Sequence, residues 1–163
     1  MKIANIGWSG NQNYGDDRMA YCIQRYFKND ELIFFNGWLD AITNIRTLNS
    51  CDYLLIGGGG LIFRGFNRYI PFLQSIKIPF GCVGISIEAD KLHNDMYEGL
   101  ELIKKRSTFI YVRDKRSRNL LNQHYKVILG PDITFLYPFD LSDRIKKGVA
   151  LNLRNWPWWD SEL

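Results

Sequence analysis

Four consecutive glycines, Gly57, Gly58, Gly59 and Gly60, directly follow the short apolar stretch at residues 53–56. Glycine loses more backbone freedom on folding than any other residue. Such a run is therefore tolerated where the backbone turns with positive φ or passes very close to a neighbouring group. At the carboxyl end of a parallel strand, that neighbour is often a ligand. The glycine run (residues 57–60) therefore predicts a ligand-facing loop, and the alternative is a tight turn that meets no ligand.

Polar residues follow other apolar stretches of the chain in the same way. Asn13, Gly15 and Asp16 come after residues 3–8, and Arg113 and Ser117 come after residues 108–112. The carboxyl ends of parallel strands meet at one edge of a sheet, so these groups would surround a shared ligand there. Together with the glycine run, these five residues form the predicted substrate-binding site.

Each part of this site also has a purely structural interpretation. Residues 13–16 fit a turn followed by a helix N-cap, and the two adjacent carboxylates that open the helix disfavour a phosphate at its N-terminus. Arg113 either pairs with Asp114 or Asp132, or grips an anion with its fork-shaped guanidinium. Ser117, one turn into a helix, is either part of the site or merely solvated.

Several familiar motifs are absent from the sequence. The glycine run lacks the Lys-Ser/Thr pair of a P-loop, and Ile62 stands where G-x-G-x-x-G needs its third glycine. There is no G-x-S-x-G elbow and no H-E-x-x-H. The three cysteines are scattered without a C-x-x-C pair and only two histidines are present, so no metal site is expected.

The segments that must position these residues alternate between strand-like and helix-like patterns. Near-continuous apolar stretches predict strands at residues 3–8, 32–35, 53–56, 80–87, 108–112, 126–129 and 148–153. Helices are expected between them, because apolar residues recur there at helical spacing. The predicted fold class is α/β, a Rossmann-like parallel sheet with helices on both faces. The polar connector at 139–147 is the best candidate for a domain boundary.

Composition narrows the classes of function. The chain has 163 residues, 46% of them hydrophobic, and a net charge of +4. This mild positive charge suits anionic small molecules or an acidic membrane surface and does not single out nucleic acid. The N-terminus is too short in its apolar part for a signal peptide, and no uncharged stretch approaches the ~20 residues of a membrane span. With scattered cysteines that are expected to be reduced, we expect a cytoplasmic protein.

An ordered set of motifs resembles the polysaccharide pyruvyl transferase family over nearly the whole chain. Its most specific parts are the glycine-rich strand and the Arg-Asp-x-x-Ser segment that begins at Arg113. The other parts are Asn-x-Gly-Asp-Asp from Asn13, Val-Gly-Ile-Ser from Val83, Gly-Pro-Asp from Gly130, and the stretch 148–154.

The resemblance implies a two-domain, GT-B-like fold, of which this chain resembles the N-terminal half. Residues 1–146 would form the Rossmann-like domain, and residues 147–163 would contribute a strand at the start of the second domain. The family's second half carries an Arg-Leu-His segment that is thought to bind phosphoenolpyruvate and to act in acid catalysis. This sequence contains no such segment, so no catalytic residue is assigned.

The resemblance also implies an activity and its partners. Pyruvyl would pass from phosphoenolpyruvate, the co-substrate, to a sugar of a cell-surface glycan, with no other cofactor. The partners would be phosphoenolpyruvate and a sugar or lipid-linked glycan acceptor, without nucleic acid, and peripheral membrane association is compatible with such an acceptor. Residues 13–16 and the glycine run would shape the cleft floor and meet the acceptor, and Arg113 would contact an anionic group.

Two other functions fit the same residues. One is a non-catalytic domain that binds a glycan or a nucleotide-sugar, and the other is half of a GT-B glycosyltransferase. Dependence on a nucleotide-sugar would favour the glycosyltransferase, and an Arg-Leu-His segment in a longer reading frame would favour the pyruvyl transferase.

Overall fold

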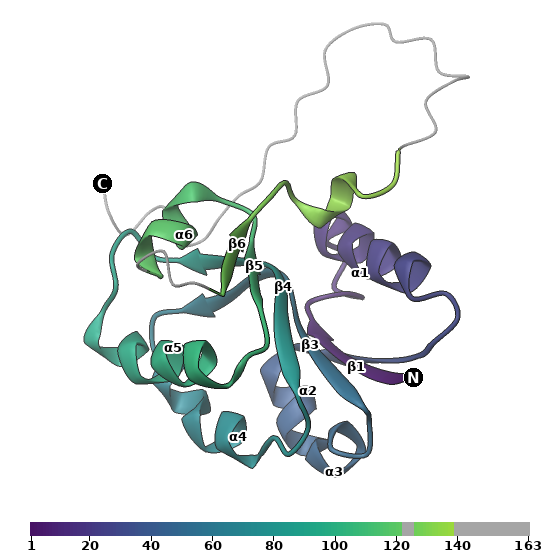
Figure 1. Cartoon of the computed structure of the whole chain (residues 1–163), viewed down its shortest axis with the longest axis horizontal. Helices are drawn as coiled ribbons and strands as arrows, with labels where there is room; N and C mark the ends of the chain where they lie inside the picture. The colour runs from purple at the N-terminus through teal and green to yellow at the C-terminus, as the bar shows by residue number, and fades with distance from the viewer. Residues whose placement is uncertain (122–125, 139–163) are drawn as a thin grey trace, which may run out of the picture.

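In the part of the chain that the structure describes, six parallel strands form one sheet in the order β2-β1-β3-β4-β5-β6 (Figure 1). The computed structural model describes residues 1–121 and 126–138. The strands are β1 (Lys2–Gly7), β2 (Glu31–Asn36), β3 (Tyr53–Phe63), β4 (Phe80–Glu88), β5 (Ile110–Val112) and β6 (Val127–Leu129). The order reverses at β1, because the chain first moves outward to β2 and then returns past β1 to β3.

Helices connect consecutive strands, because parallel neighbours need crossover connections. The α-helices are α1 (Tyr14–Tyr26), α2 (Gly37–Thr43), α3 (Ile45–Leu48), α4 (Ile70–Ser75), α5 (Asn94–Arg106) and α6 (Lys115–Leu120). Two 3₁₀ turns, η1 (Phe66–Tyr69) and η2 (Ile133–Phe135), complete the described elements. The prediction of an α/β fold with a Rossmann-like parallel sheet is confirmed.

Alternate residues of each strand face opposite sides of the sheet and divide the core in two. Ala4 and Ile6 belong to the larger core, which also holds buried residues of α2, α3 and α5. Ile3 and Leu55 face the other side and pack with Ile23 of α1. Figure 1 shows α1 on one side of the sheet and α2 to α5 on the other. Helices therefore cover both faces, but unequally.

β3 is longer than the sequence pattern predicts. The prediction of a loop at residues 57–60 is wrong, because the strand continues through all four glycines. Gly57 pairs with Val83 and Gly59 pairs with Ile85 of β4, and the register shifts beyond Gly59. Glycine is a poor strand former, so composition alone favours a loop. Pairing with β4 overrides that preference and makes the run an irregular part of the strand.

Two smaller expectations are also corrected. β1 ends at Gly7, so Trp8 is not the end of a buried strand but a residue that is 50% exposed. The N-cap of α5 is His93, although the next two residues, Asn94 and Asp95, have the side chains that usually cap a helix. The strand expected at 148–153 and the domain boundary after residue 146 lie outside the described residues.

Candidate functional site

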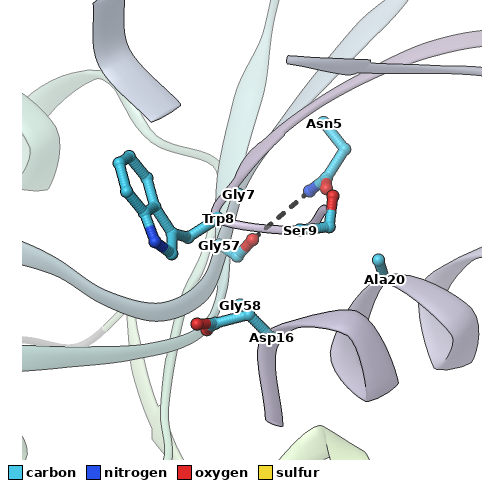
Figure 2. Close-up of a pocket in the computed structure, with 8 residues that line it drawn as sticks. All are labelled: Asn5, Gly7, Trp8, Ser9, Asp16, Ala20, Gly57 and Gly58. Carbon is cyan, nitrogen blue, oxygen red and sulfur yellow. Dashed lines mark hydrogen bonds between the residues drawn. The ribbon is translucent and has the colours of Figure 1, made fainter. Parts of the chain in front are cut away.

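The strand order places a topological switch between β1 and β3, whose connections run to opposite faces of the sheet. In open parallel sheets, ligands bind at such a switch, beyond the carboxyl ends of the strands. A shallow hollow lies at this place; its space of about 160 Å³ includes open solvent, and it encloses no room for a water molecule. Figure 2 shows its lining residues, which come from the end of β1 and the two residues after it, from the middle of β3 and from α1: Asn5, Gly7, Trp8, Ser9, Asp16, Ala20, Gly57 and Gly58.

The glycine run lies directly against α1. Gly58 and Gly59 have φ angles of +89° and +117°, which side-chain-bearing residues rarely adopt. A Cβ at Gly59 would lie 2.8 Å from Oδ1 of Asp16, and a Cβ at Gly58 would lie 3.3 Å from the Cβ of Met19. The expected positive φ and close approach are therefore present. The close neighbours are side chains from the first half of α1.

Residues 13–16 begin α1 and place its first carboxylate beside the glycine run. Asn13 is the N-cap, and its side chain accepts a hydrogen bond from the Gly15 amide at 3.2 Å. The Asn13 amide group also donates to the Asp16 carboxylate. Oδ1 of Asp17 accepts a hydrogen bond from the Gly10 amide at 2.6 Å. The capping interpretation is thus confirmed, and the two carboxylates complement the positive end of the helix.

Asn5 is a buried polar residue of the hollow that the sequence analysis missed. It is 2% exposed, and its side-chain amide donates to the carbonyl of Leu55 at 3.2 Å and to that of Gly57 at 3.5 Å (Figure 2). Buried polar groups need such partners. Asn5 therefore ties β1 to the start of the glycine run. An asparagine inside the otherwise apolar stretch 3–6 was the signal available in the sequence.

Arg113 starts a network that joins the ends of β4, β5 and β6. Its Nε donates to Oγ of Ser86 at 2.8 Å, and its Nη1 pairs with Oδ2 of Asp132 at 2.8 Å. Ser86 in turn donates to Oδ2 of Asp114 at 2.9 Å. The ion pair with Asp132 is therefore one of the two alternatives foreseen for Arg113. The arginine side chain remains 27% exposed.

Ser117 is fully buried inside this network, so the solvated interpretation is wrong. Its hydroxyl donates to Oδ2 of Asp114 at 2.8 Å and accepts from the amide of Ile87 at 2.8 Å. Its own amide donates to Oδ1 of Asp114, the N-cap of α6, at 2.7 Å. Ser117 therefore fastens the start of α6 to the end of β4.

The two carboxylates of the network have lowered pKa values. Burial would raise the pKa of Asp114, but hydrogen bonds from the amide and hydroxyl of Ser117 and from Ser86 outweigh it and lower the pKa. Burial likewise opposes ionisation of Asp132, and hydrogen bonds from an amide of η2 and from Arg113 lower its pKa below the usual value. Both groups are therefore negatively charged at neutral pH.

The glycine run and Arg113 lie along the same edge of the sheet. Gly59 pairs with Ile85 of β4, and Ile85 pairs with Val112, the residue before Arg113. At ordinary strand spacing, two steps across a sheet correspond to about 10 Å. The expectation of one shared edge is confirmed. Along it, residues 13–16 meet the glycine run, and the network of Arg113 and Ser117 forms a second cluster.

The family model described as Polysaccharide pyruvyl transferase matches residues 13–163. The chain belongs to this family. The match begins at the N-cap of α1, and its range includes the glycine run and the network around Arg113. Among curated proteins and among solved structures, no significant match was found.

This member of the pyruvyl transferase family has a larger groove, of about 1460 Å³ including the part open to solvent, on the α1 side of the sheet. Ile23 of α1, Leu55 and Val83 of the sheet and Ile133 of η2 are among its mostly apolar lining residues, and Asp132 is the charged residue among them. A polar sugar needs several hydrogen-bonding groups, which such a surface does not supply. The hollow between β1 and β3 is therefore the better candidate for the sugar site of a pyruvyl transferase.

Within residues 1–121 and 126–138, no three His, Cys, Asp or Glu side chains are grouped so that they could hold a metal ion. None of the helices in this part of the chain combines the length and the apolar character needed to cross a bilayer.

Proposed function

We propose that this protein takes part in the transfer of pyruvyl from phosphoenolpyruvate to a sugar of a cell-surface glycan. The observation that carries the proposal is the family match, which extends over residues 13–163 and includes Asp16, the glycine run and Arg113. The position of that site at the β1/β3 switch supports the proposal, because ligands of open parallel sheets bind there.

The proposed reaction balances without an oxidant or a metal. Two hydroxyl oxygens of the sugar form bonds to the central carbon of phosphoenolpyruvate, and the bond from that carbon to the phosphate oxygen breaks. The methylene carbon gains one proton, and phosphate leaves with the other. The enzyme must supply a proton donor and must stabilise the negative charges of phosphate and carboxylate.

The acceptor sugar is proposed to lie at the hollow, against the glycine run and residues 13–16. Carboxylate oxygens accept hydrogen bonds from hydroxyl groups, which suits Asp16 at the edge of the hollow. Negative charge at this helix N-terminus repels phosphate and does not repel a neutral sugar. The side-chain-free backbone of Gly57 and Gly58 lets a sugar approach closely.

Arg113 is proposed to bind an anionic group of the donor, in addition to its pairing with Asp132. Its guanidinium has five N–H donors, and within the described residues the network engages Nε and Nη1. The side chain is partly exposed at the same edge as the hollow. Ser117 is proposed to act indirectly, by holding the network in place. We further propose that the reaction takes place in the cytoplasm, at the membrane surface if the acceptor is lipid-linked.

The experiment is a transfer assay with the chain, phosphoenolpyruvate and candidate sugar acceptors, free, nucleotide-linked and lipid-linked. Formation of the pyruvate ketal is followed by mass spectrometry and phosphate release by a coupled assay. Arg113→Ala should raise the KM for phosphoenolpyruvate more than the KM for the sugar. Arg46→Ala, which removes an exposed arginine of α3, is the matched control and should change neither.

Two outcomes would contradict the proposal. Sugar binding without any binding of phosphoenolpyruvate would favour a glycan-binding domain, and transfer of a sugar from a nucleotide-sugar donor would favour a glycosyltransferase. Unchanged kinetics in Arg113→Ala would remove the donor-binding role and leave the structural ion pair with Asp132.

A further inference from the structure

Trp8 is a large aromatic residue at the mouth of the hollow. It directly follows β1, lines the hollow and is 50% exposed. A single exposed aromatic residue is ordinary on a protein surface. Ligand sites commonly combine aromatic side chains with a few polar groups. Trp8 lies beside polar groups and glycine backbone at the switch point of the sheet.

The indole of Trp8 is held in place by the structure around it. Gly37 has a φ of +74°, and a Cβ there would lie 2.9 Å and 3.1 Å from two ring carbons of Trp8. The absence of a side chain at Gly37 thus lets the ring pack against the start of α2. The side-chain amide of Asn11 donates to the carbonyls of Trp8 and Ser9 at 3.2 Å and 3.3 Å. It also donates to Oδ1 of Asn36 at 2.7 Å, which fastens this loop to the end of β2.

The other walls of the hollow complement an aromatic surface. Gly57 and Gly58 contribute only backbone to the lining. In Figure 2 the indole of Trp8 and the carboxylate of Asp16 extend to the same side of the Gly57 and Gly58 backbone. In the same view Asn5, Ser9 and Ala20 lie on the other side of that backbone, so the aromatic surface and the carboxylate acceptor border the hollow together.

We propose that Trp8 is a platform on which a neutral pyranose ring of the acceptor stacks, with ring hydroxyls directed to Asp16. Axial C–H groups of a pyranose carry slight positive charge and pack against the electron-rich face of an indole. The negative charge of Asp16 favours a neutral sugar over a uronic acid or a sugar phosphate at this position. The identification of this sugar as the acceptor rests on the proposed pyruvyl transfer. Stacking of a sugar on Trp8 can be measured even if no pyruvyl is transferred.

The test uses the full chain and methyl β-D-glucopyranoside, a neutral pyranoside with axial C–H bonds on both faces of the ring. Saturation-transfer NMR should label the ring protons of one face most strongly. Trp8→Ala should weaken binding about 3- to 10-fold, the range of one aromatic contact, and Trp8→Phe should restore part of it. Tyr97→Ala removes an exposed aromatic residue of α5, away from the hollow, and should leave binding unchanged.

Thermal melting of each variant separates loss of binding from loss of fold. No binding of the probe to the folded wild type, or equal binding by folded Trp8→Ala and wild type, would overturn the platform. In the transfer assay, Trp8→Ala should raise the KM for the acceptor while kcat changes little. Ketal formation with an unchanged acceptor KM would refute the platform alone. Trp8-dependent sugar binding by a chain that does not bind phosphoenolpyruvate would refute the proposed function alone.

Discussion

Replacing Ser117 by alanine tests whether the network at the end of β5 holds the candidate site together. The substitution removes one hydroxyl from a fully buried position and leaves the shape of the backbone unchanged. That hydroxyl links Asp114, which caps α6, to the amide of Ile87 at the end of β4. We therefore expect a loss of stability rather than a specific loss of ligand affinity.

The magnitude follows from the two hydrogen bonds that are lost. A hydrogen bond to an ionised carboxylate contributes about 1.5–3 kcal/mol, and a buried amide left without a partner costs about 1–3 kcal/mol. The two effects share one side chain and do not add fully, so the expected loss is about 2–4 kcal/mol. This is a large part of the roughly 5–15 kcal/mol that stabilises a typical domain.

Urea unfolding followed by circular dichroism measures this loss. With an m-value of about 2 kcal/mol/M, the midpoint should fall by about 1–2 M while m stays constant. Ser75→Ala is the matched control, because Ser75 is exposed and its hydroxyl donates only to a carbonyl of its own helix. If Ser117→Ala and Ser75→Ala shift the midpoint equally, the hydroxyl does not fasten α6 to β4 and the reasoning fails.

Three further predictions concern other parts of the fold. Gly57→Ala should prevent native pairing of β3 and β4, because its Cβ would lie 1.9 Å from the carbonyl oxygen of Val83. Gly15→Ala should fold, because the atom nearest to its Cβ would lie 3.5 Å away. Circular dichroism compares the two variants. Lys126→Met should lower the melting temperature by several degrees, because its ammonium group donates hydrogen bonds to three carbonyls at the end of α5. Together these bonds contribute about 1–2 kcal/mol to stability. An unchanged melting temperature would contradict this prediction. Because the pKa of Asp132 is lowered, its contribution to stability is complete above the unfolded-state pKa of about 4 and is lost as the pH falls from there through the native pKa. The stability difference between wild type and Asp132→Asn should therefore shrink in urea titrations as the pH falls below about 4, and a constant difference would refute this prediction.

The fold follows from the sequence because its strands and helices have strong local patterns. Buried residues Met96, Leu100 and Ile103 recur at helical spacing in α5, and the structure places all three in the core. The parallel arrangement follows from the alternation of apolar strands with helices. The shared edge of the candidate site then follows from topology, which is why residues 57–60 and Arg113 were expected along one side of the sheet.

Other features depend on contacts between distant residues and leave no local pattern. The four glycines have low strand propensity, and only pairing with β4 keeps them in a strand. The burial of Ser117 depends on its partners Asp114 and Ile87, and helical periodicity does not reveal them. Tryptophan is common in strands, so the sequence favours strand at Trp8. Trp8 is exposed because β1 ends one residue earlier, at Gly7.

The central claim is that the carboxyl edge of the sheet, at the β1/β3 switch, holds the sugar. Amide NMR of the full chain titrated with methyl β-D-glucopyranoside tests it directly, because each backbone amide reports on its own surroundings. We predict that the largest shifts fall on residues 57–60 and 13–16 and on Trp8. Shifts that cluster instead along the apolar groove beside α1, at Leu55, Val83 and Ile133, would contradict the assignment of the site.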